Sequence, residues 1–286
     1  MVGSSGTGST LTRDDLVIST DRLAKLLGDE CVRVVDVRFA LDDEDRGERE
    51  YERGHVPGAV YLHWLRDLSD PDDPVPGQIA PSDRFRKTME AAGIGDDTAV
   101  VAYDDGVILM AGRLVWCLHC YGHEKVRVLD GGFLKWAREG KPVEAGRGRP
   151  RRRAVFTPRP SPQFRATKDD VLRALERGDR VLLDCRMDET WAAAGAHIPG
   201  ARRFPAPALV YPGDGTLRAA GEIERMATEA GTGRGSPLLL YCGGGVSAAW
   251  AYTALRTVGY RHLRVYDGSW AEWGPDPSAP KEQHNS

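Results

Sequence analysis

One cysteine, Cys242, stands in a sequence context that suits a nucleophile. It follows the apolar run 238–241, which predicts a buried strand, and it precedes three glycines and the helix-like segment 247–258. Glycines let the backbone curl so that successive N–H groups point at one centre, and such a nest at a helix start stabilises an anion. The same field favours the thiolate form of a cysteine. We therefore expect a reactive thiol at this position.

A thiolate in such a loop can accept a sulfur atom and pass it on, because the resulting persulfide is also an anion that the same amides would hold. Cysteine phosphatases share this order of strand, cysteine, loop and helix. They need an arginine six residues after the cysteine to bind phosphate through two hydrogen bonds. Ala248 occupies that position. The loop thus favours sulfur transfer over phosphate transfer, with a purely structural cysteine as the remaining alternative.

The chain contains a duplication in which four segments recur in one order. Each half has a strand ending in Asp-x-Arg, then His-Val/Ile-Pro-Gly-Ala, then an apolar strand, and finally a strand that runs into Asp-Gly and tryptophan. The spacing also agrees, since 75 residues separate His55 from Asp130 and 70 separate His197 from Asp267. Agreement in both order and spacing indicates two copies of one domain.

Short Val- and Leu-rich runs bounded by Gly and Pro are typical of strands buried on both faces, and amphipathic segments between them predict helices. Strands that alternate with helices imply a mainly parallel sheet with helices on both sides. We expect two α/β domains, at residues 11–145 and 166–276. The other segments would be a flexible tail at 1–10, a solvated linker at 146–165 and a flexible tail at 277–286.

The composition narrows the class of protein. Hydrophobic residues make up 41% and charged residues 28% of the chain, as in ordinary globular proteins. A net charge of -3 argues against a general nucleic-acid binder. No apolar run approaches the ~18 residues of a membrane span, and residues 1–10 lack the apolar core of a signal peptide. Five scattered cysteines argue against a disulfide framework and favour a cytoplasmic location.

These motifs resemble those of the two-domain rhodanese-type sulfurtransferases, and the resemblance covers the chain between the tails. The most specific segments are His-Val-Pro-Gly-Ala at 55–59 and Tyr-Asp-Gly-Ser-Trp-Ala-Glu-Trp at 266–273. The resemblance implies two tandem rhodanese-like domains, with a catalytic Cys242 in the second and an inactive first copy. The cysteine position of that copy falls on Asp104 or Asp105, and a carboxylate cannot be a sulfur nucleophile. No metal and no cofactor are implied.

The loop after Cys242 bears on the choice of sulfur donor. It would hold the persulfide through Gly243, Gly244, Gly245, Val246 and Ser247. Thiosulfate sulfurtransferases tend to have arginine directly after the cysteine, whereas mercaptopyruvate sulfurtransferases tend to have Cys-Gly-Ser/Thr-Gly-Val-Thr. This loop is more similar to the second pattern, so 3-mercaptopyruvate is the favoured donor and thiosulfate the alternative. Gly244 departs from the pattern because it lacks a hydroxyl group.

The resemblance leaves the partner of the donor's carboxylate open. The mercaptopyruvate branch places substrate-binding arginines between the second Asp-x-Arg and its histidine, but residues 187–196 contain no arginine. The candidates that could replace them are Arg186, Arg202 and Arg203. His55 and Asp45 could orient or protonate the keto acid from the first domain, as the resemblance implies. A structural histidine is the alternative for His55.

Further hypotheses concern a metal site, the sulfur acceptor and a function of another class. Cys117, His119 and Cys120 lie within one helical run and do not complete a zinc site without another ligand, so core packing is expected. The sulfur acceptor would be a thiol, such as that of a thioredoxin-like protein, or cyanide, with no nucleic acid or membrane partner. A hypothesis of another class is a non-catalytic persulfide relay that is loaded by a desulfurase and serves a partner protein.

Overall fold

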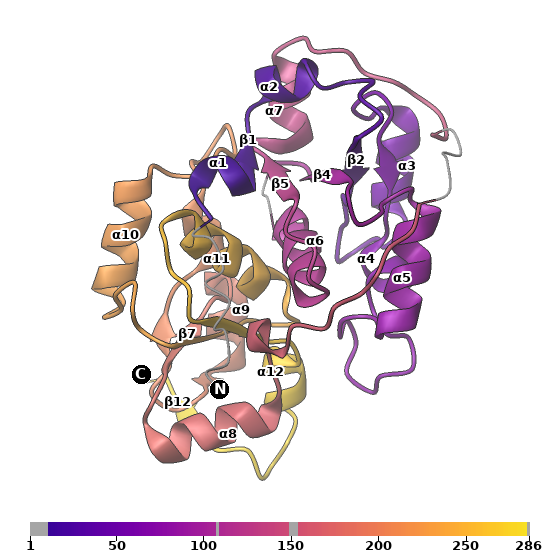
Figure 1. Cartoon of the computed structure of the whole chain (residues 1–286). Helices are drawn as coiled ribbons and strands as arrows, with labels where there is room; N and C mark the ends of the chain where they lie inside the picture. Colours follow the sequence, from indigo (N-terminus) through magenta and orange to yellow (C-terminus); the bar gives the residue numbers. More distant parts are fainter. Residues whose placement is uncertain (1–10, 107–108, 149–153, 285–286) are drawn as a thin grey trace, which may run out of the picture.

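The computed structural model describes residues 11–106, 109–148 and 154–284, and each half of the chain forms a five-stranded sheet. The strand order is β1-β5-β4-β2-β3 in the first sheet and β6-β11-β10-β7-β9 in the second. Every pairing within these two sheets is parallel. Helices flank both sheets (Figure 1). The expected pair of α/β domains with parallel sheets is therefore confirmed.

The elements of the first domain are α1 (Arg13–Leu16), β1 (Val17–Ile18), α2 (Thr20–Ala24), β2 (Val32–Asp36), α3 (Arg46–Arg53), β3 (Val60–Tyr61), α4 (Trp64–Asp67), α5 (Ser82–Ala91), β4 (Ala99–Tyr103), α6 (Leu109–Cys120), β5 (Val126–Leu129) and α7 (Gly132–Arg138). Those of the second are η1 (Pro162–Phe164), β6 (Arg165–Ala166), α8 (Lys168–Arg177), β7 (Val181–Asp184), α9 (Asp188–Ala194), β8 (Ala196–His197), β9 (Arg202–Arg203), η2 (Ala206–Leu209), α10 (Ala220–Glu229), β10 (Leu238–Tyr241), α11 (Val246–Thr257), β11 (Leu263–Tyr266), α12 (Ser269–Trp273) and β12 (Glu282–Gln283).

The register of the central strands brings the motifs together. Asp36 lies beside Tyr103 in the β2–β4 pair, and Asp184 lies beside Tyr241 in the β7–β10 pair. Because the strands are parallel, their carboxyl ends meet at one edge of the sheet. Each Asp-x-Arg motif therefore adjoins the loop that follows the central strand of its own domain.

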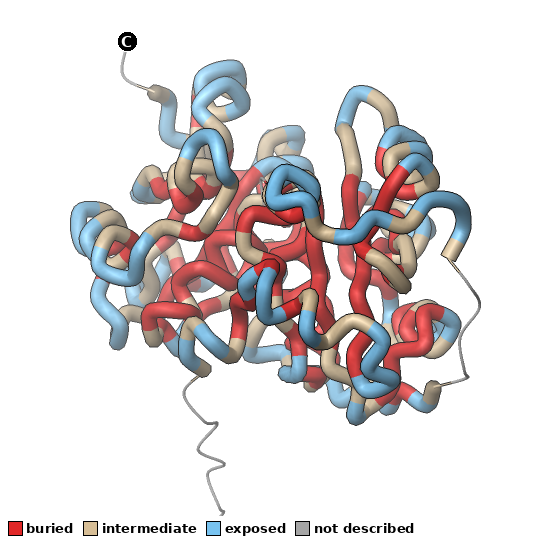
Figure 2. Tube along the Cα trace, turned by 90° about the horizontal axis from the view of Figure 1, so that it is seen from above, coloured by how far each residue is buried: buried red, intermediate tan, exposed pale blue. Residues whose placement is uncertain are grey.

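The two domains pack against each other through α6 and α11, the helices that follow those two loops (Figure 1). Both helices are apolar over nearly their whole circumference, which is typical of helices buried on all sides. A Cβ atom on Gly112 would lie 2.7 Å from the Cα of Trp250, so glycine allows the close approach. The buried residues run without a break from one domain into the other (Figure 2). The helix behind Cys242 is thus anchored on the first domain.

The segment after residue 276 differs from the expected flexible tail. Strand β12 pairs with β8 in the antiparallel sense, and the Glu282 carboxylate accepts a hydrogen bond from the Gly200 N–H at 2.8 Å. The first domain has the same arrangement, because Glu144 bridges to His55 and accepts from the Gly58 N–H at 2.8 Å. The expectation of a flexible tail is therefore wrong for residues 277–284. These residues are the fifth element of the duplication.

The linker also differs from expectation at its carboxyl-terminal side. Phe156 is buried against Phe85, and the N–H of Arg159 donates to the carbonyl of Tyr121 at 2.9 Å. Arg165 already belongs to β6. Residues 154–164 are therefore attached to the first domain at Phe156 and Arg159, while most of their other side chains remain exposed or half-buried. The expected tail at 1–10 and residues 149–153 of the linker lie outside the described residues. No helix in the described ranges is long and apolar enough to cross a membrane.

Candidate active site

Cys242 is the first residue after β10 and is 2% exposed. Its N–H donates to the hydroxyl of Ser269 at 3.1 Å, and its carbonyl accepts from the N–H of Trp270 at 2.9 Å. The carbonyl of Gly243 accepts from the N–H of Ala271 at 2.9 Å. The start of α12 therefore holds the cysteine and the first glycine in place. Ser269 has a φ of 50°, which is uncommon for a residue other than glycine and marks this contact as a constrained one.

The glycine loop ends at Gly245, the residue before α11. Gly245 has a φ of 80°, and a Cβ atom there would lie 2.9 Å from the carbonyl oxygen of Asp267, so only glycine fits. Within the described part of the chain, no protein acceptor takes the N–H groups of residues 243–247. The first N–H groups of a helix are unpaired and carry partial positive charge. A negative charge on the Cys242 sulfur thus lies beside unused donors.

Cys242 opens into a cavity of about 370 Å³ between the two domains. Four of the five loop residues expected to hold a persulfide line it, and Gly245 does not. Most of the wall is apolar, and its large side chains are Phe39, Leu41, Trp64, Leu109, Met110 and Met187. The acidic residues at the cavity are Asp42, Asp104 and Asp105, and among the described residues that line it, Arg186 is the one cation. The cavity therefore combines one guanidinium and three carboxylates with a largely apolar wall.

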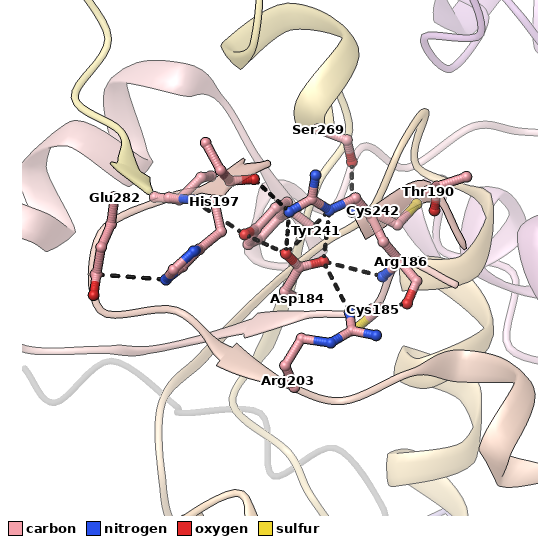
Figure 3. A network of polar contacts seen from close by, with 12 residues as sticks. Asp184, Cys185, Arg186, Thr190, His197, Arg203, Tyr241, Cys242, Ser269 and Glu282 are labelled. Carbon is pink, nitrogen blue, oxygen red and sulfur yellow. Dashed lines mark hydrogen bonds and ion pairs between the residues drawn. The ribbon is translucent and has the colours of Figure 1, made fainter. Parts of the chain in front are cut away.

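Arg186 is 1% exposed and is held by Asp184, Ala196 and Trp270; Figure 3 shows its polar contact with Asp184. Its Nη2 lies 2.6 Å from a carboxylate oxygen of Asp184 and donates to the carbonyl of Ala196 at 2.9 Å. Its guanidinium carbon stacks 4.5 Å above the ring of Trp270. Its Nη1 is buried and has no hydrogen-bond partner among the described residues. A fixed guanidinium with one unused donor group is suited to bind an anionic substrate.

The other two candidate arginines are not brought to the cavity. Arg202 donates through Nη1 to the carbonyls of Ala230 and Gly231, at 3.0 and 2.7 Å. Arg203 donates to the carbonyl of Arg186 at 3.0 Å and forms an ion pair with Asp188. Both side chains leave from β9, at the edge of the sheet, where they satisfy backbone and surface groups instead. The geometry does not support their assignment to the donor.

His55 and Asp45 also lie away from the cavity. The His55 ring is buried, stacks on Tyr51 and places Nδ1 2.8 Å from the Tyr51 carbonyl oxygen. These contacts support the alternative given above for His55, a structural role. Asp45 precedes α3, is 68% exposed, and lies 3.4 Å from Nη1 of Arg66. The acidic residue that this loop places at the cavity is instead Asp42.

Sequence reasoning missed Arg113, a fully buried arginine on α6 of the first domain. Its Nη1 forms an ion pair of 2.6 Å with Asp267 and donates to the Gly245 carbonyl at 3.3 Å. Its Nη2 donates to the carbonyl of Gly77 at 2.7 Å. Burial alone would lower the pKa of Arg113, but the Asp267 carboxylate raises it above its usual value. A single arginine in an otherwise apolar helix was the signal for this cross-domain support.

The cysteines of α6 are core residues. Burial raises the pKa of Cys117 to about 12 and that of Cys120 well above its usual value. His119 places Nδ1 2.9 Å from the hydroxyl of Tyr252, across the domain interface. Within the described ranges, no group of three His, Cys, Asp or Glu side chains is placed to hold a metal ion. These thiols contribute apolar packing between the domains.

The first domain has an aspartate where the second has its cysteine. The carbonyl of Asp104 accepts from the N–H of Phe133 at 2.8 Å, as the carbonyl of Cys242 does from Trp270. This settles the choice between Asp104 and Asp105. The Asp104 carboxylate accepts hydrogen bonds from the N–H groups of Gly106, Met110 and Ala111, at 2.9, 3.0 and 3.2 Å.

Comparison with known proteins finds the same family over both halves. The model described as "Rhodanese-like domain" matches residues 19–139 and 167–276. A 3-mercaptopyruvate sulfurtransferase of Escherichia coli is 31% identical over 93% of this chain and 97% of its own length. The sulfur carrier protein TtuD of Thermus thermophilus is 33% identical over 91% and 94%. The crystal structure of the E. coli 3-mercaptopyruvate enzyme SseA has a TM-score of 0.83 at 30% identity, covering 91% of this chain and 99% of that one.

Proposed function

The chain belongs to the rhodanese family and is a sulfurtransferase, and from this premise we propose that it carries the transferred sulfur as a persulfide on Cys242. The support is the position of this residue, beside the unpaired N–H groups of its loop and at the wall of the interdomain cavity. A negative charge on either sulfur of the persulfide would be stabilised there. We further propose 3-mercaptopyruvate as the donor.

The proposed first step balances without a cofactor. The Cys242 thiolate attacks the thiol sulfur of 3-mercaptopyruvate, and an S–S bond forms while the bond from sulfur to carbon 3 breaks. The electron pair of that bond passes into the enolate of pyruvate. The thiol proton of the donor ends on the methyl group of pyruvate, and the enzyme retains the persulfide anion. In the second step a thiol or cyanide attacks the outer sulfur and regenerates the Cys242 thiolate.

The observation that carries the choice of donor is the unused Nη1 of Arg186. It offers a donor group of a guanidinium whose charge is already compensated by Asp184, and this donor suits the single carboxylate of a 2-oxo acid. Asp42 and Asp105 at the same cavity oppose any anion, and they would oppose thiosulfate, a compact dianion, more strongly than a single carboxylate. The apolar remainder of the wall suits the carbon skeleton of the 2-oxo acid.

The test compares kcat/KM for 3-mercaptopyruvate and thiosulfate in wild-type protein and in Arg186→Lys, with cyanide as acceptor. Lysine keeps the charge but loses the planar group that stacks on Trp270 and binds Asp184. We expect 3-mercaptopyruvate to be preferred and its KM to rise about tenfold or more in the variant. Arg202→Lys, a similar change outside the cavity, is the control. Preference for thiosulfate, or an unchanged KM, would contradict the proposal.

The alternative of a persulfide relay is favoured by one finding, the similarity to a protein named a sulfur carrier. Both functions use Cys242, so mutation of this residue cannot separate them. Turnover can, because an enzyme converts small donors whereas a relay is loaded by a desulfurase and does not.

The five cysteines form no disulfide, which supports a reducing compartment such as the cytoplasm as the place of action.

A further inference from the structure

Trp64 is a residue of the first domain that reaches the loop of the second. It is the first residue of α4, is 8% exposed and lines the cavity that contains Cys242. Its Cη2 atom lies 3.9 Å from the place that a Cβ atom of Gly244 would take. The ring of Phe39 packs edge-on against it, with 5.3 Å between the ring centroids. On its other side, a Cβ atom on Gly77 would lie 2.6 Å from Cζ2. The indole is therefore fixed between the two domains.

The indole N–H of Trp64 is buried and has no acceptor among the described residues. Three other tryptophans show the usual arrangement, since Trp116, Trp136 and Trp273 donate to backbone carbonyls at 2.8–3.0 Å. Trp250 shares the unpaired N–H but does not line the cavity. A buried donor without a partner calls for an explanation. For Trp64 the adjacent cavity supplies one, because a bound ligand can be the acceptor.

We propose that the indole N–H of Trp64 donates a hydrogen bond to the 2-oxo oxygen of bound 3-mercaptopyruvate. This rests on the proposed function and adds a catalytic residue to it. The 2-oxo oxygen is adjacent to the carboxylate, which Arg186 would hold. As the bond from sulfur to carbon 3 breaks, the electron pair moves onto this oxygen as the enolate forms. A neutral donor at that oxygen stabilises the developing charge and keeps its own proton throughout.

The experiment separates the two half-reactions in Trp64→Phe, which removes the N–H and keeps an aromatic ring. Rapid mixing with 3-mercaptopyruvate measures loading of the persulfide on Cys242, and mixing of loaded protein with cyanide measures unloading. We expect loading at saturating donor to slow about 100-fold, as for loss of one oxyanion donor. Unloading forms no enolate and should change less than about threefold. Trp250→Phe, the same chemical change away from the cavity, should alter neither rate by more than this.

The ratio of the two rates is measured on one preparation, so it does not depend on the fraction of folded protein. Equal slowing of both half-reactions would assign Trp64 a structural role and overturn the inference. Loading at the wild-type rate in Trp64→Phe would overturn it while leaving the proposed function intact. Wild-type protein that is not loaded by 3-mercaptopyruvate would refute the proposed donor, and this inference with it.

Discussion

The two loops that follow the central strands differ in the residue at their centre. In the first domain, the Asp104 carboxylate accepts hydrogen bonds from the N–H groups of Gly106, Met110 and Ala111. In the second domain, Cys242 occupies the equivalent place, and the N–H groups of residues 243–247 have no acceptor in the described chain. The first loop thus shows that backbone N–H groups in this arrangement can bind an acidic group. It contains a carboxylate where we propose that the second holds a persulfide.

The arginines of the two Asp-x-Arg motifs show the same difference. Arg38 and Arg186 each bind the aspartate two residues earlier at 2.6 Å. The Nη1 of Arg38 faces the Asp105 carboxylate at 4.0 Å, whereas the Nη1 of Arg186 has no partner in the described residues. Burial raises the pKa of Asp105 although Arg38 opposes the shift. In the first domain, Asp104 and Asp105 occupy the two places where the second domain has donors without a partner among the described residues. This teaches why one copy can be structural and the other catalytic.

Cys242→Asp would make the second loop resemble the first. We expect sulfur transfer to fall below about 0.1% of wild type, because a carboxylate cannot form a persulfide. The melting temperature should hold or rise, since the new carboxylate can accept the unused N–H groups. Calorimetry and turnover on 3-mercaptopyruvate measure the two effects. As the control, Cys185→Ala removes a neighbouring buried thiol and should retain activity. Sulfur transfer by Cys242→Asp would show that Cys242 is not the sulfur carrier.

Arg113→Met tests the support that the first domain gives to the second loop. It leaves the buried Asp267 carboxylate without its main ion-pair partner, which costs about 3 kcal/mol of unfolding free energy. Denaturant unfolding measures this loss. The double variant Arg113→Met with Asp267→Asn should recover part of it, because no unpaired charge then remains. Additive losses in the double variant would mean that the two residues act independently.

Asp104→Ala removes the carboxylate from the first loop. We expect a loss of about 1–2 kcal/mol, comparable with the loss of a helix cap, because the N–H groups of Gly106, Met110 and Ala111 lose their acceptor. Asp104→Asn keeps one acceptor oxygen and should lose less. Loading of Cys242 should be retained in both, as measured by the mass increase of one sulfur. Equal stability of Asp104→Ala and wild type would show that these hydrogen bonds contribute little.

Glu282→Ala and Glu144→Ala compare the two copies of the terminal strand contact. Each carboxylate accepts one N–H, from Gly200 or Gly58, at 2.8 Å. We expect each variant to lose about 1 kcal/mol of unfolding free energy, the smallest of these effects. Thermal unfolding measures both. A loss confined to Glu144→Ala would show that β12 contributes nothing to the second domain, despite the shared geometry.

The duplication and the strand–loop–helix order could be predicted because they depend on local patterns. The expected strand 238–241 coincides with β10, and the helix expected at 247–258 begins one residue earlier, at Val246. The terminal strand was missed because its two copies share only Pro-x-Glu, at 142–144 and 280–282. In each, a tryptophan N–H binds the proline carbonyl, at 2.8 and 2.9 Å. A tryptophan followed by Pro-x-Glu in both halves was therefore the sequence signal for this strand.

The sequence by itself determined the nucleophile's context and the repeated architecture, because both follow from short-range spacing: a strand, Cys242, three glycines and a helix. Only the tertiary structure decided what surrounds the cysteine. Arg202, Arg203 and His55 matched expected positions but satisfy backbone groups elsewhere. Trp64 and Arg113, distant in sequence, reach the loop because α6 packs on α11 and closes the first domain against the second. Side-chain partners across an interface depend on packing, which spacing along one chain does not encode.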